Sequence, residues 1–138
     1  MRKEAMILLC VLLALCVNTP EESEYTKAAN ADKVVVVHFH RIHQCTCCIN
    51  VGKWAEETIQ TYFADEYETG FLEYKDVCVE KNHEEAARYN AFGSSLYINV
   101  IQNGNDNISE IAEVWNHCHD HDAYIEVFKQ ILDDIVHG

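Results

Sequence analysis

The stretch VVVVHFHRIHQCTCCINV, residues 34–51, decides the fold. Residues 34–39 are almost wholly apolar and mostly β-branched, which is typical of a strand buried on both faces of a sheet. In residues 48–66, apolar side chains recur at i, i+3, i+4, i+7 and i+8, the spacing of one face of an amphipathic helix. Cys45 and Cys48 stand between the two in CxxC spacing. The stretch therefore predicts a strand, a cysteine-bearing loop and a helix, the first unit of an α/β domain.

The rest of the chain continues the alternation of strands and helices. Further segments with strand or helix patterns are a strand at 71–79, a helix at 82–90, strands at 95–102 and 108–116, and a helix at about 123–136. Asn103-Gly104 is a hairpin signal, so the strand at 108–116 should return antiparallel. The earlier steps predict two parallel βαβ units with right-handed crossovers. The order β-α-β-α-β-β-α predicts an α/β domain over residues 33–138, a thioredoxin-like layout with a central four-stranded mixed sheet flanked by helices.

Composition bounds the classes of function. The chain has 138 residues, of which 49% are hydrophobic and 24% charged, as expected for one globular domain. Ten Lys and Arg against 23 Asp and Glu give a formal charge of -13. A nucleic-acid binder needs a basic face to neutralise phosphates, so the composition excludes that class of partner.

The N-terminus has the pattern of an export signal. Arg2 and Lys3 precede an unbroken apolar run at 5–17, shorter than the roughly 20 residues that span a bilayer. Leu13-Ala14-Leu15-Cys16 resembles a lipoprotein cleavage box, which makes Cys16 a candidate lipid anchor. An uncleaved signal anchor and simple secretion remain the alternatives. Residues 18–32 are polar and acidic, which predicts a tether and an extracytoplasmic protein, membrane-anchored or secreted.

The CxxC pair is the candidate catalytic site. Cys45 falls just before a predicted helix, where unpaired N–H groups and the helix dipole stabilise a thiolate. Cys48, one turn on and more buried, is placed to resolve a mixed disulfide with a protein partner. This interpretation requires no cofactor. An inert structural disulfide is the alternative.

Further cysteines and histidines are expected to lie near the CxxC pair. His38 and His40 alternate in the strand, and the loop before the last helix contains three more histidines and a cysteine. The candidate metal ligands are His43, Cys47, His117, Cys118, His119 and His121. Thiolate and imidazole suit Zn²⁺, Cu⁺ or an iron–sulfur cluster, and the spacing does not choose among them. A solvated loop, a hydrogen-bonded core role for His38 and a buried, inert Cys78 are the competing interpretations.

Several short motifs carry a family resemblance. They are Val37-His38-Phe39-His40, Cys45-Thr46-Cys47-Cys48 leading into Ile49-Asn50-Val51, Glu56-Glu57-Thr58, Ala64-Asp65-Glu66, Arg88-Tyr89, Ser94-Ser95-Leu96 and Val114-Trp115. On these residues the chain is similar to the nitrophenyl compound nitroreductase subunit ArsF family, whose members have a thioredoxin fold. The resemblance covers nearly all of residues 34–136. It implies that Cys45, Cys48 and the strand-end His40 are family positions.

The chain departs from ordinary thioredoxins in two ways. Gln44 precedes the first cysteine and Thr46-Cys47 separates the pair, so the redox potential cannot be transferred. Ser95 is expected where thioredoxins have a cis-proline facing the cysteines, which leaves the dithiol less shielded from a metal. His40, Cys47 and Ser95 are therefore candidate modulators of the redox pair.

Three functions follow from these observations. The first is an exported thiol–disulfide redox protein that uses Cys45 and Cys48. The second is a metal- or metalloid-binding protein that uses the thiols and histidines. The third is a non-catalytic interaction subunit in which the cysteines only staple the fold.

Overall fold

The computed structural model describes residues 25–138. The predicted export signal, the candidate lipid anchor Cys16 and the first part of the predicted tether lie outside the described residues. Within residues 25–138, every helix is too short or too polar to cross a membrane.

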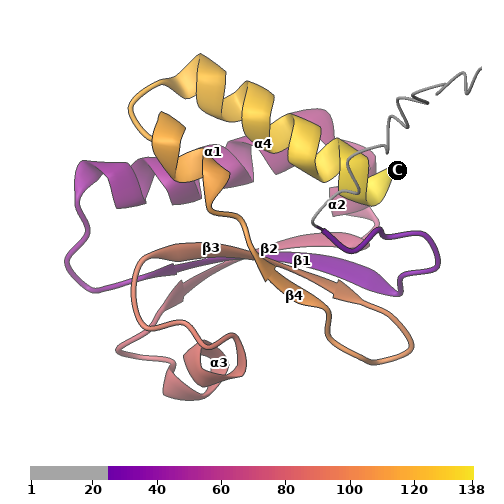
Figure 1. The fold of residues 1–138 in the computed structure, drawn as a ribbon, viewed down its shortest axis with the longest axis horizontal. Coiled ribbons are helices and arrows are strands. Elements are labelled where there is room, and N and C mark those ends of the chain that lie inside the picture. Colours follow the sequence, from indigo (N-terminus) through magenta and orange to yellow (C-terminus); the bar gives the residue numbers. More distant parts are fainter. Residues whose placement is uncertain (1–24) are drawn as a thin grey trace, which may run out of the picture.

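Strands and helices alternate along the described chain (Figure 1). In order they are β1 (Lys33–His40), α1 (Thr46–Tyr62), α2 (Ala64–Glu68), β2 (Leu72–Cys78), α3 (His83–Arg88), β3 (Ser95–Ile101), β4 (Ile108–Glu110), the 3₁₀ helix η1 (Glu113–His117) and α4 (His121–Val136).

The strands form one mixed four-stranded sheet in the order β2-β1-β3-β4. β1 is parallel to β2 and antiparallel to β3, which pairs antiparallel with β4. Helices α1 and α4 cover one face of the sheet and α3 lies against the other (Figure 1). The predicted α/β class and the thioredoxin-like order of elements are confirmed.

The direction of β3 was predicted wrongly. The alternation of strands and helices predicts a second parallel step, whereas β3 runs antiparallel to β1. The connecting helix α3 has six residues, about 9 Å of length, and a seven-residue strand such as β3 spans about 23 Å. Because so short a helix does not carry the chain back along the sheet, β3 starts near the end at which β2 stops.

β1 is buried on both faces, as its composition predicts. Val34 and Val36 pack into the cluster under α1 and α4, and Val35, Val37 and Phe39 pack into the cluster under α3. Side chains alternate along a strand, so His38 lies on the same face as Val34 and Val36. This register points His38 toward α1.

Two predicted elements end early. The helix predicted at 48–66 is two helices, because Phe63 leaves helical geometry with φ −128° and ψ 35° and buries its ring. The strand predicted at 108–116 stops at residue 110. Beyond it the buried residues Ile111, Val114 and Cys118 recur at i, i+3 and i+7, a helical rather than a strand period, and the chain forms η1.

Residues 25–32, which the sequence assigns to the tether, pack on the domain. Tyr25 and Ala28 are buried in the main core. The backbone N–H of Ala28 donates to the carbonyl of Ile135 at 2.7 Å, and the hydroxyl of Tyr25 donates to Glu113 at 2.6 Å. Two buried side chains with these bonds are enough to dock a segment that is otherwise polar.

Candidate functional site

Cys45 occupies the N-cap of α1. β1 ends at His40, a short loop follows, and Cys45 has extended backbone angles while its carbonyl already accepts a hydrogen bond from the N–H of Ile49 at 3.1 Å. Its side chain is exposed and its thiol is free. No acidic residue lies in the first turn of α1. The positive end of the helix dipole is therefore not neutralised there by a carboxylate and can stabilise a thiolate at Cys45.

Cys48 lies one turn further and is buried, with 1% of its surface exposed. Its Sγ is 3.1 Å from Oγ of Ser94 and 3.3 Å from Oε1 of Gln44. The third polar neighbour is Nε2 of His38, at 3.6 Å. Burial raises the pKa of the Cys48 thiol, which disfavours the thiolate unless a neighbour takes the proton.

His38 joins Cys48 to a carboxylate. Its Nδ1 lies 2.7 Å from Oδ1 of Asp76, which stands directly opposite it in the parallel register of β1 and β2. A carboxylate only accepts hydrogen bonds, so Nδ1 of the neutral ring carries the proton and Nε2 presents its lone pair to the sulfur. Burial lowers the pKa of His38 and outweighs the opposing effect of Asp76. The interpretation of His38 as a hydrogen-bonded core histidine is confirmed.

Gly52 makes room for the His38 ring. A Cβ on Gly52 would lie 2.4 Å from Nδ1 of His38, closer than any van der Waals contact. Gly52 is itself buried in α1, and its carbonyl accepts a hydrogen bond from the hydroxyl of Tyr74 at 3.0 Å. The absence of a side chain at residue 52 thus lets α1 approach β1 closely enough for the histidine to meet Cys48.

Cys47, between the CxxC pair, forms a disulfide with Cys118. The bond joins the first turn of α1 to the turn that precedes α4, across a sequence separation of 71 residues. Asn50 reinforces the join, because its side-chain amide donates to the carbonyl of Cys118 at 2.9 Å. The predicted proximity of the 117–121 segment to the cysteines is therefore present.

The candidate metal ligands do not form one group among the described residues. Cys47, Cys118 and His119 have ligand atoms within 4.8 Å of one another, but both sulfurs are bonded to each other. The imidazole of His121 lies at the start of α4 against Glu57, with Nε2 3.0 Å from Oε1. His43 is exposed and His117 half-buried. Metal binding stays a prediction.

The other two predicted modulators of the redox pair are His40 and Ser95, and only His40 lies where it was expected. His40 stacks on His38 with ring centroids 5.6 Å apart, and its Nε2 lies 3.1 Å from Oδ2 of Asp76. The expectation that Ser95 faces the cysteines is wrong by one residue. The hydroxyl of Ser95 donates to the carbonyl of Gly93 at 3.1 Å, and Ser94 contacts Cys48 instead. Ser95 already belongs to β3, and the residue just before that strand turns toward α1.

Sequence reasoning missed Asp76, Ser94 and Gly52. Asp76 lies opposite His38 because Val34 pairs with Leu72, a register that the predicted strand at 71–79 does not fix. No spacing rule marks Gly52, whose role depends on the distance between a helix and a strand.

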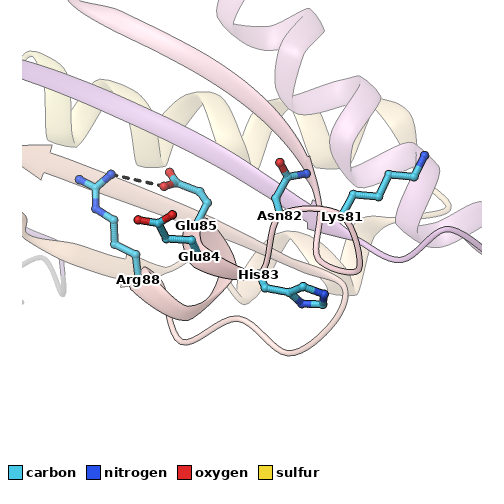
Figure 2. Close-up of a pocket in the computed structure, with 6 residues that line it drawn as sticks. All are labelled: Lys81, Asn82, His83, Glu84, Glu85 and Arg88. Atoms are coloured by element: carbon cyan, nitrogen blue, oxygen red, sulfur yellow. Dashed lines mark ion pairs between the residues drawn. The ribbon is translucent and has the colours of Figure 1, made fainter.

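Two hollows differ in their relation to the cysteines. A cavity of about 720 Å³ is lined by α3 and the turn before it, on the face opposite α1. Figure 2 shows the side chains that line this cavity. No cysteine among residues 25–138 lines it. A smaller hollow of about 250 Å³ opens beside His38, and its lining includes Asp76 and residues of α1. The His38–Asp76 pair therefore borders solvent-accessible space although His38 itself is buried.

The fold and the cysteines define a thioredoxin-like α/β protein with a disulfide and two free thiols at the N-terminus of α1. Among solved structures, the chain is similar to a thioredoxin from Thermus thermophilus, with 18% sequence identity and a TM-score of 0.47 over 72% of this chain and 74% of that chain. No protein-family model and no curated protein matches the chain. The resemblance to the ArsF family stays a prediction.

Proposed function

We propose that this protein is an exported thiol–disulfide redox protein in which Cys45 attacks a partner disulfide and Cys48 resolves the mixed disulfide. The observation that carries the proposal is the unequal exposure of the pair. Cys45 is exposed at the N-cap of α1, and Cys48 is buried one turn on. An accessible nucleophile and a shielded resolving thiol are what sequential exchange requires.

The disulfide at Cys47 leaves this pair free to act. Cys47 is bonded to Cys118, whereas Cys45 and Cys48 are both thiols. Residues three apart on a helix are neighbours, with about 5–6 Å between Cβ atoms, so a small movement brings Cys45 and Cys48 into bonding range. A free Cys45–Cys48 pair beside a separate Cys47–Cys118 disulfide supports the donation of two electrons to a partner.

Export is supported by the N-terminal sequence. Arg2 and Lys3 followed by the apolar run at 5–17 match the charge and length of a signal. An oxidising compartment also suits a protein that keeps a disulfide. The natural partners in this proposal are exported proteins with exchangeable disulfides. The proposal also includes membership of the ArsF family, which the sequence motifs support.

The test uses the full chain with Cys10, Cys16 and Cys78 replaced by Ala, here named the four-cysteine variant. In this background, reduction of insulin disulfides is measured with a supplied dithiol as electron donor. Cys45→Ser is expected to abolish the stimulated rate. Cys48→Ser, reduced beforehand and mixed with insulin after the dithiol has been removed, is expected to accumulate a covalent Cys45–insulin adduct, detected by mass spectrometry and released when reductant is added back.

The matched control is the pair Cys47→Ala and Cys118→Ala, which removes the disulfide next to the CxxC pair. Exchange is expected to persist in this variant. If exchange instead survives Cys45→Ser and disappears with Cys47 and Cys118, the active couple is the observed disulfide and the proposal is wrong.

A further inference from the structure

Cys48 needs a base if it is to resolve a mixed disulfide. The thiolate is the nucleophile, and burial disfavours that charged form. Three polar atoms lie near its sulfur, from Ser94, Gln44 and His38. A hydroxyl and an amide do not accept a proton at neutral pH, and an imidazole does. Among the described residues that touch the sulfur, His38 alone has basic chemistry.

We propose that His38 is a catalytic residue, the general base that takes the Cys48 proton, and that Asp76 is the positioning residue that holds its ring. The nucleophile, the base and the orienting carboxylate are joined by two contacts. Sγ of Cys48 lies 3.6 Å from Nε2 of His38, and Nδ1 of His38 lies 2.7 Å from Oδ1 of Asp76. This is the general arrangement by which a side chain activates a weak nucleophile. The inference rests on the proposed function.

In the mixed disulfide between Cys45 and a partner, Cys48 gives its proton to Nε2 of His38 while its sulfur attacks Sγ of Cys45. The Cys45–partner S–S bond breaks, a Cys45–Cys48 disulfide forms, and the partner leaves as a thiolate. The imidazolium then returns the proton to that thiolate or to water. Two protein thiols are oxidised and one partner disulfide is reduced.

The state of His38 before the reaction suits this role. Burial lowers the pKa of the ring, so the ring is neutral and free to accept a proton at neutral pH. The positive charge it then gains is stabilised by the adjacent carboxylate of Asp76. The hollow beside His38 and Asp76 gives the proton access to water.

The other titratable groups around His38 come from three elements. β1 contributes His40, β2 contributes Asp76 and Tyr74, and α1 contributes Lys53 and Glu56 at the rim of the hollow, besides Cys48 itself. Burial raises the pKa of Tyr74, which stays a neutral phenol. Cys45 carries no proton while it is in the mixed disulfide.

The test separates the two chemical steps with 5,5′-dithiobis(2-nitrobenzoate), an aromatic disulfide. In the reduced-dithiol form of the four-cysteine variant, Cys45 releases one thionitrobenzoate on attack and Cys48 releases the second. Stopped-flow absorbance follows both. Cys48→Ser, which shows only the first phase, identifies the second. The first phase serves as an internal control for folding and for access to Cys45.

His38→Gln is expected to slow the second phase by about 10²-fold or more at neutral pH, the usual contribution of a general base, and to leave the first unchanged. The pH profile separates a base from a structural residue. The native second phase is expected to be flat between about pH 7 and pH 9, and the His38→Gln rate to rise about tenfold per pH unit, as direct ionisation of Cys48 requires. His137→Gln, which removes a histidine that also pairs with carboxylates, is the matched control.

Asp76→Asn is a second variant, for use if His38→Gln does not fold. It changes an exposed side chain and keeps its shape. It is expected to slow the second phase and to move its lower inflection to lower pH, because Asp76 raises the pKa of His38. A second phase in either variant that stays within about threefold of the native rate, with the same pH profile, overturns the role of His38 and leaves the Cys45–Cys48 proposal intact. Absence of a second phase in the parent protein overturns both.

Discussion

The disulfide between Cys47 and Cys118 should be the largest single covalent contribution to stability in the described domain. It closes a loop with a sequence separation of 71 residues. For a loop of that length, the chain-entropy description of disulfides gives about 4 kcal/mol at 25 °C, gained by restricting the unfolded chain. A domain of this size has a free energy of unfolding of about 5–15 kcal/mol, so the bond accounts for a large fraction of the total.

The native contacts around the bond do not depend on it. Cys118 is buried in the main core, and the hydrogen bond from Asn50 to its carbonyl involves no sulfur and should persist when the disulfide is broken. Breaking the bond should therefore act mainly on the unfolded chain. The near-ultraviolet circular dichroism of Trp54 and Trp115 should stay the same, while the free energy of unfolding falls.

The assay is equilibrium unfolding in urea of the four-cysteine variant carrying Cys45→Ser, so that reductant acts on one disulfide. The midpoint should fall by roughly 2 M on reduction, since small proteins have urea slopes of about 1–3 kcal/mol/M. The protein with Cys47→Ala and Cys118→Ala should match the reduced form and be insensitive to reductant. A difference below about 1 kcal/mol between the oxidised and reduced forms would refute the reasoning from loop entropy.

Two further predictions concern single side chains. Gly52→Ala places a Cβ 2.4 Å from Nδ1 of His38, and the overpacking should lower the free energy of unfolding by about 1–3 kcal/mol in urea titration; an unchanged midpoint would contradict the tight approach of α1 to β1. Hydrogen bonds to Asp133 and Glu66 raise the pKa of His137, so the stability it contributes is complete below its unfolded pKa of about 6.5 and is lost as pH rises through the higher folded value. The stability difference between the native protein and His137→Gln should shrink from pH 6 toward about pH 8, and a difference that grows over this range would show that the sign is wrong.

Much of the fold was predictable because the signals are local. The run at 34–39 identifies a strand buried on both faces, and the apolar stripes identify the long helices. The direction of β3 was not predictable from local patterns, because it depends on how far the short α3 carries the chain. β4 ends at Glu110 because the apolar residues that follow are buried in the core at a helical spacing and not at the alternating spacing of a strand.

The chemistry near Cys45 and Cys48 was predictable only in part, for a similar reason. The order of elements brings Cys118 near the first turn of α1, and the CxxC spacing gives the relative depth of its two thiols. The partner of each side chain depends on register and rotation. Asp76 meets His38 because β1 and β2 pair with Val34 opposite Leu72, and a slip of one residue would turn the carboxylate to the other face of the sheet.

Rotation along the helix explains how one turn holds three cysteines in separate environments. Successive side chains on a helix diverge by about 100°. Cys45 at the N-cap therefore faces solvent, Cys47 faces the turn before α4, and Cys48 faces the sheet and His38. A helix that began one residue later would place Cys48 where Cys47 now lies and Ile49 where Cys48 now lies, so that the disulfide with Cys118 would engage Cys48 and no thiol would lie beside the imidazole. The start of α1 at Thr46 thus decides which sulfur anchors the last helix and which stays next to a base.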